Sequence, residues 1–128
     1  MEAAVERLAA LVLLLTCLSH ITAPHAWRLL FDRIRASGDT AGLANAAIHL
    51  PLGLIIVAFH NVWSGWPLVI TVLGYALLLK GTLQLLFPKL AQKSLALPGV
   101  GKMAEARYRL GGLLMLPLAI LLAWIAFS

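Results

Sequence analysis

Three ionisable side chains, His20, His49 and Lys80, lie inside long apolar stretches of this chain. An imidazole or an ammonium group is costly in an apolar medium, so each needs a polar partner or a functional reason to be there. Together they would make a cationic pocket rich in hydrogen-bond donors, suited to an anion, a lipid headgroup or a quinone carbonyl. We therefore treat them as candidate ligand-binding residues, together with three more polar residues of the same stretches: Thr16, Asn45 and Gln84.

Helical spacing sorts these side chains into faces. On a helix of 100° per residue, Thr16 shares a face with His20, and Lys80 lies one turn before Gln84. Lys80 is about 12 Å from the end of its apolar run, and two interpretations of its side chain stay open. It extends to the nearer membrane surface, or it faces the interior beside His20 and His49.

Metal, haem and catalytic chemistry are less well supported. A metal site built from His20, His25 and His49 would lack any cysteine or nearby intramembrane carboxylate. A haem on His49 needs a second ligand from another helix, and only His20 or Met115 is available, so one haem or a bound quinone is a remote interpretation. Ser19 is a direct sequence neighbour of His20, and such pairs do not share a helix face. We predict no catalytic residue, no metal and no cofactor. The sequence therefore favours a protein without enzymatic activity over an enzyme.

Composition places these residues in a membrane. Of the 128 residues, 62% are hydrophobic and 12% are charged, whereas soluble domains carry roughly 25% charged residues. Mean hydropathy is +0.94. Because so little polar surface cannot cover a soluble core, we predict one all-α transmembrane domain over residues 1–128. The net charge of +5 suits the anionic headgroups of a membrane and not nucleic acid.

Four apolar runs are each long enough to cross a bilayer as a helix, which takes about 20 residues. Prolines mark several of their ends, at Pro24, Pro67 and Pro88. The first run is expected to remain in the mature protein, because the residues before it lack the basic start of a secretory signal. The predicted spans are 3–23, 41–63, 66–87 and 108–127.

The segments after the first and third spans are amphipathic. In residues 25–36, Trp27 and Phe31 share one helical face, and Arg28 and Arg35 lie opposite. This pattern is typical of a short helix lying in the membrane interface, and a weaker copy follows the third span. The alternative is a helical loop packed on the bundle.

Charge asymmetry predicts the topology. Eight basic residues lie in these two segments, against one, Arg7, at the opposite ends of the spans. Because basic loops stay in the cytoplasm, we predict cytoplasmic segments, with both termini and the tryptophan turn at 63–66 outside. The eight are Arg28, Arg33, Arg35, Lys89, Lys93, Lys102, Arg107 and Arg109.

Internal similarity predicts a tandem duplication of a two-helix unit, with copies of about 1–64 and 65–128. The triplet Leu-Pro-Leu at 50–52 recurs at 116–118, both inside apolar runs. The two copies would cross the membrane in the same direction, related by an axis along its normal. The other matches are Pro24 with Pro88, Thr16 with Lys80, His20 with Gln84, His49 with Met115 and Ala46 with Gly112.

Small residues mark the faces where helices are expected to meet, because they let backbones approach closely. In the second span they share one stripe with His49. In the third span the small residues Gly74 and Gly81 share a face with Thr71, and the sequence assigns no helix of this chain to that face. We therefore expect a homo-oligomer or a larger complex to form through it. The predicted packing residues are Gly42, Ala46, Gly53, Gly74, Gly81 and Gly112.

The run HNVW at 60–63, followed by Trp66, Lys80-Gly81 and Pro88, resembles small four-helix bacterial inner-membrane proteins of uncharacterised function. The resemblance covers mainly the middle third of the chain. It implies a four-span protein of the bacterial inner membrane and supplies no activity.

Two function classes follow from these observations. The mostly aliphatic spans favour a non-catalytic scaffold or accessory subunit of a membrane complex. The alternative is a binding or permeation protein that handles an anionic or amphiphilic small molecule or lipid, and Lys80 with His20 and His49 favours it.

Overall fold

The computed structural model describes residues 1–128 and is entirely helical, without a strand. It confirms an all-α chain with four helices that are long and apolar enough to cross a membrane. A span of this kind must satisfy its backbone hydrogen bonds internally, which a helix does. The four helices are α1 (Glu2–Thr22), α3 (Ala41–Phe59), α4 (Leu68–Leu86) and α6 (Gly101–Phe127).

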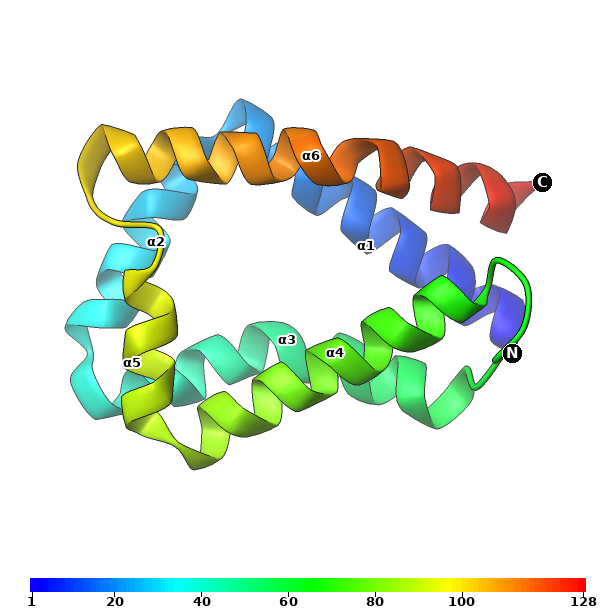
Figure 1. The fold of residues 1–128 in the computed structure, drawn as a ribbon, viewed down its shortest axis with the longest axis horizontal. Helices are drawn as coiled ribbons and strands as arrows, with labels where there is room; N and C mark the ends of the chain where they lie inside the picture. The colour runs from blue at the N-terminus through cyan, green and yellow to red at the C-terminus, as the bar shows by residue number, and fades with distance from the viewer.

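Two shorter helices, α2 (Pro24–Ala36) and α5 (Pro88–Ala96), run across one end of the four long ones (Figure 1). Each begins with a proline, and the residues before them, Ala23 and Phe87, leave the helical conformation with φ of −131° and −126°. A proline disfavours the α conformation in the residue before it, so the chain turns sharply at both places. A 3₁₀ turn, η1 (Gly38–Thr40), joins α2 to α3.

Two helix boundaries differ from the sequence prediction. α3 ends at Phe59 and not at residue 63, because His60 is extended, with φ of −140° and ψ of 98°. α6 begins at Gly101, seven residues before the predicted start, so the basic stretch after Gly101 is part of the same helix. Its Lys, Met, Ala, Glu and Arg residues are strong helix formers.

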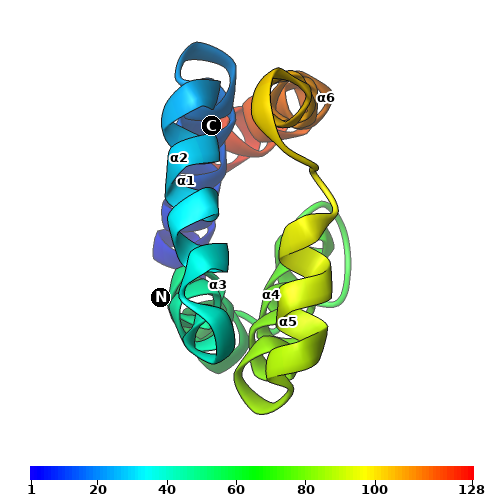
Figure 2. The same cartoon turned by 90° about the vertical axis from the view of Figure 1, so that its left-hand side faces the viewer.

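The long helices form two antiparallel pairs, α1 with α6 and α3 with α4 (Figures 1 and 2). Both termini and the loop between α3 and α4 lie at one end, called here the terminal end, and α2 and α5 lie at the other, called here the crossing end. Within the pairs, α1 meets α6 at Gly112, where a Cβ would lie 2.7 Å from the Cys17 carbonyl oxygen. Likewise, a Cβ on Gly53 would lie 2.7 Å from the Leu78 nitrogen. Only glycine permits these approaches.

The predicted oligomer face on α4 is wrong. Thr71, Gly74 and Gly81 are buried within the chain itself, against α3 and the loop that follows it. A Cβ on Gly74 would overlap Ile56, and one on Gly81 would come within 2.6 Å of Leu50 Cγ. The face has a partner because α4 turns back directly onto α3, so its small residues serve contacts inside one chain.

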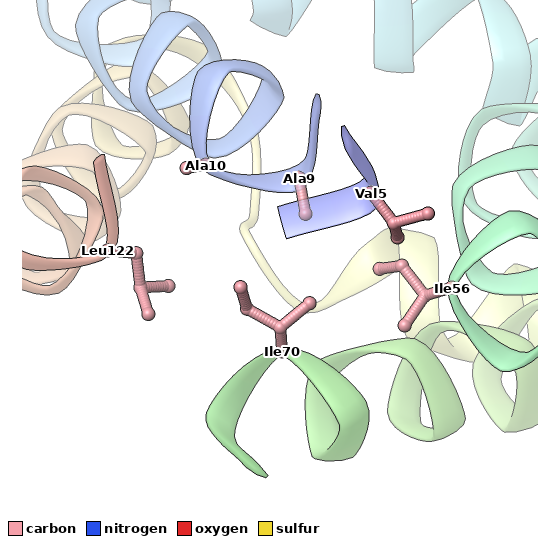
Figure 3. Close-up of a cluster of buried hydrophobic side chains, with 6 residues drawn as sticks. All are labelled: Val5, Ala9, Ala10, Ile56, Ile70 and Leu122. Atoms are coloured by element: carbon pink, nitrogen blue, oxygen red, sulfur yellow. The ribbon is translucent and has the colours of Figure 1, made fainter. Parts of the chain in front are cut away.

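The two pairs meet in an apolar core at the terminal end, to which all four long helices contribute (Figure 3). These side chains point toward one another, and none is more than 5% exposed. Toward the crossing end the pairs diverge, and α2 and α5 run across that end of the molecule. The core residues are Val5, Ala9, Ala10, Ile56, Ile70 and Leu122.

Candidate functional site

Five of the six candidate ligand-binding residues line one cavity between the two helix pairs. The cavity has a volume of about 380 Å³, which falls within the usual range for small-molecule sites of about 300–1,000 Å³. α1, α3 and α4 supply most of the wall, and α2, α5 and α6 close the crossing end. The five polar residues are Thr16 and His20 from α1, Asn45 and His49 from α3, and Lys80 from α4.

Lys80 lines the cavity beside His49, the second of its two predicted positions, and it remains an exposed residue there. Its Nζ lies 3.1 Å from His49 Nε2, and His49 Nδ1 lies 2.9 Å from the Asn45 carbonyl oxygen. Because a carbonyl only accepts, His49 carries its proton on Nδ1, and its Nε2 lone pair accepts a hydrogen from the Lys80 ammonium. The ammonium keeps further donors free for a ligand in the cavity.

His20 lies on the α1 wall of the same cavity. Its Nδ1 donates to the Thr16 carbonyl oxygen at 2.8 Å, and its Nε2 makes no hydrogen bond within the chain. The ring stacks on Trp27 at a centroid distance of 4.2 Å. Its free Nε2 is therefore an acceptor available to a bound molecule.

Aromatic rings form the cavity wall at the crossing end. Trp27 stacks on Phe31, and Phe31 stacks on Tyr108 with centroids 5.6 Å apart. The Trp27 Nε1–H donates to the Ser19 hydroxyl at 2.9 Å, which fixes α2 against α1. The helical pattern of the sequence indicates Trp27 and Phe31 only as the apolar face of α2 and does not show their place in the site. The meeting of this face with Tyr108 on α6, 77 residues further on, has no local signal.

The cavity is polar in one half and apolar in the other. The polar side chains lie toward the crossing end of the long helices, and most of the lining residues nearer the middle of these helices are aliphatic, although Ile48 lies between Asn45 and His49. This change in polarity runs along the helix axes. It matches a membrane amphiphile, which has a polar head at one end and an apolar chain at the other. The aliphatic lining residues are Val12, Leu13, Ile48, Leu52, Leu73 and Leu77.

Gln84 does not line the cavity. It is 2% exposed, neither side-chain polar atom has a partner within the chain, and its backbone carbonyl lies against Gly42. On a helix of 100° per residue, Gln84 lies closer to the face of Lys80 than to that of Gly74 and Gly81. It lies one turn beyond Lys80 toward the crossing end, outside the cavity. Asn45 does line the cavity, and its buried Oδ1 also lacks a partner within the chain.

A second polar cluster, missed in the sequence analysis, links α1, α4 and the loop after α3 at the terminal end. The fully buried His60 lies between Glu6 Oε1, at 3.1 Å from its Nε2, and Thr71 Oγ1, at 3.0 Å from its Nδ1. The Thr71 hydroxyl already donates to the Val62 carbonyl, so His60 must donate from Nδ1. A single proton then forms the hydrogen bond between the His60 Nε2 and the Glu6 carboxyl. This bond ties the loop between α3 and α4 to α1.

Ion pairs join α2 to α6 at the crossing end. Glu105 accepts hydrogen bonds from Arg28 at 2.8 Å and His25 at 2.9 Å, and Asp32 pairs with Arg28 and Arg35. The hydrogen bond to Glu105 raises the pKa of Arg28 above its ordinary value. No group of three or more His, Cys, Asp or Glu side chains comes together as a metal site would require.

Comparison of the chain with protein-family models, curated proteins and solved structures gives no match. The cavity is the feature of the chain that indicates a function.

Proposed function

We propose that this chain is a multi-pass membrane protein that binds an amphiphile with an anionic head in its central cavity. The observation that carries the proposal is the convergence of five polar side chains from three helices on a space whose other half is aliphatic. Helix packing alone does not require polar side chains to converge on an open space, and intramembrane polar groups usually mark a site.

In this proposal the anionic head contacts the Lys80 ammonium, which His49 holds in place from α3. A charge-assisted hydrogen bond to an ammonium is about twice as strong as a neutral one. His20 Nε2 and the Thr16 and Asn45 side chains offer further polar contacts. The apolar chain of the ligand lies among the leucines nearer the middle of the helices.

The proposed membrane is the bacterial inner membrane, with both termini outside. The distribution of exposed charge supports this orientation, because the basic side chains gather at the crossing end. At the terminal end, Trp63 and Trp66 are each 61% exposed, as aromatics at a membrane–water boundary are. α2 and α5 would then lie in the cytoplasmic interface. A cysteine at Ser128 should react with an impermeant maleimide added outside, and labelling only from the cytoplasm would refute this orientation.

A tandem duplication is proposed on similar grounds. If α1–α2–α3 corresponds to α4–α5–α6, then the α1–α6 pair corresponds to the α4–α3 pair, and these are the two main pairs of the fold. Pro51 and Pro117 both lie inside the last long helix of a copy. Because each pair mixes the copies, fragments 1–64 and 65–128 should assemble when coexpressed. Stable folding of either fragment alone would contradict this arrangement.

The scaffold or accessory-subunit interpretation is the second candidate. It is favoured by the broad aliphatic surface of the long helices, where residues such as Leu114 and Trp124 are about 70% exposed. Lipid would cover such a surface equally well, so it argues less strongly than the cavity. A detergent-corrected mass above one 13.8 kDa chain in several mild detergents would support a homo-oligomer, and a mass of one chain would count against it.

Native mass spectrometry of the protein extracted from its membrane in a mild detergent tests the proposal. We expect a bound amphiphile of acidic character in the wild type and its loss in Lys80→Met. Lys89→Met is the matched control, because Lys89 is exposed on α5 and does not line the cavity. Equal retention of the amphiphile by all three proteins would contradict the assigned role of Lys80.

A further inference from the structure

The two sides of the central cavity are closed differently. On one side α1 packs against α3, but on the other α4 makes almost no contact with α6. Figures 1 and 2 show α1 and α3 on one face of the molecule and α4 and α6 on the other, with a wide separation between α4 and α6. The aliphatic core holds α4 near α6 only at the terminal end, through Ile70 and Leu122.

A second cavity of about 270 Å³ lies along α6 and adjoins the first. The two share Leu13, Thr16, His20 and Tyr108, so only these side chains separate them. From this boundary the second cavity continues along α6 past Gly111 to Met115, which is 40% exposed. A Cβ on Gly111 would meet no atom within 4 Å, so this part of α6 borders open space.

Large apolar side chains line the cavity at the crossing end. Trp27 and Phe31 of α2, Leu95 of α5 and Pro98 line the cavity there, so bulky side chains stand between the polar residues and the water at that surface. The route along α6 is mainly apolar, with the cationic Arg107 at its crossing end. A molecule on this route keeps its chain in an apolar medium while its head moves from Arg107 toward Lys80.

We infer that the ligand is a membrane lipid of the single-chain acid class, and that it enters from the bilayer along the second cavity, which α1 and α6 line, past Gly111 and Met115. This inference rests on the proposed function, since it names the source and class of the molecule bound at Lys80. Lipid acids concentrate in the bilayer, which the exposed Met115 on α6 would face, whereas large apolar side chains line the cavity at the crossing end.

Filling the opening tests the route. Gly111→Trp adds a large side chain to the wall of the second cavity, and Met115→Trp does so from the next turn, since both residues line the second cavity and not the central one. Leu114→Trp is the matched control, because Leu114 lies on the same helix, is 70% exposed and lines neither cavity. The probe is a fatty acid carrying a photoreactive diazirine, dissolved in vesicles that contain the reconstituted protein.

The measurement is the rate at which the probe becomes cross-linked to the protein, together with its equilibrium occupancy. We expect loading to be several-fold slower in Gly111→Trp and Met115→Trp, with wild-type rates in Leu114→Trp and unchanged equilibrium occupancy throughout. Equal rates in all four proteins would overturn the route. Loss of equilibrium occupancy in the two cavity variants would also overturn it, by placing the ligand in the second cavity. Equal loading from hexanoate supplied in water would refute a bilayer source, and absence of binding to the wild type would refute the proposed function.

Discussion

Two adjacent glycines on α6 should respond in opposite ways to the same substitution. At Gly112 an added Cβ would lie 2.7 Å from the Cys17 carbonyl oxygen and 2.9 Å from His20 Cβ, whereas at Gly111 it would meet nothing. Of the two atoms that would oppose this Cβ, one is a backbone oxygen of α1 and the other is the His20 Cβ, which is bonded directly to the backbone. Neither can rotate away. Gly112→Ala must therefore push α1 and α6 apart.

The magnitude follows from comparing the two variants. Overpacking of this kind costs about 1–3 kcal/mol, and the change from glycine to alanine in a helix returns up to about 1 kcal/mol. The gain in helix propensity from glycine to alanine is the same at both positions, so it cancels in the difference between the two variants. Gly112→Ala should therefore be about 1–3 kcal/mol less stable than Gly111→Ala, and Gly111→Ala should be at least as stable as the wild type.

Unfolding by sodium dodecyl sulfate added to mild detergent micelles, followed by circular dichroism, measures this difference. Equal midpoints for the two variants would refute the close α1–α6 contact and with it the position of His20 on the cavity wall. A lower midpoint for Gly111→Ala than for Gly112→Ala would show that α6 is rotated relative to α1.

Three further predictions concern polar and buried groups. Glu6→Gln should keep the fold nearly as stable as the wild type, because the glutamine amide can donate a hydrogen bond to His60. Glu6→Ala should lower stability by about 1–3 kcal/mol, because it leaves a buried nitrogen of His60 unpaired. Similar unfolding midpoints for the two variants would contradict the cluster. His49→Ala should lower stability by about 0.6–2 kcal/mol, the range for hydrogen bonds between membrane helices, and an unchanged midpoint would argue against its bond to Lys80. Cys17, which is 4% exposed, should react with a small maleimide far more slowly in mild detergent than after unfolding, and equal rates would place it on the surface.

The sequence was sufficient to predict four apolar helices, because these depend on hydropathy and length. Helical spacing grouped the polar residues into faces but left two positions open for Lys80. Gln84 shows the limit of this reasoning. It shares a broad face with Lys80, but it lies one turn nearer the crossing end, where its backbone carbonyl lies against Gly42 of α3, and only Lys80 borders the cavity. This difference depends on how α3 and α4 pack in space, which hydropathy and helical spacing do not report.

His60 shows a second limit. Its spacing fits the stripe of His49, but the helix ends one residue earlier, and His60 turns toward Glu6 of α1. Helix ends are set by local backbone geometry and by partners from other elements, which periodicity does not report. The pairing of Tyr108 with the aromatic residues of α2 has the same origin, since it requires the tertiary arrangement of α2 and α6.

The affinity of the protein for a long-chain fatty acid tests the central claim most directly. Dissociation constants would be measured for the wild type, Lys80→Met and Lys89→Met in the same detergent at constant ionic strength. A hydrogen bond to a charged group contributes about 1.5–3 kcal/mol, so Lys80→Met should weaken binding by about 10- to 100-fold. Lys89→Met should bind like the wild type. Equal affinities in all three proteins, or no binding to any of them, would contradict a cavity that holds an acidic amphiphile at Lys80.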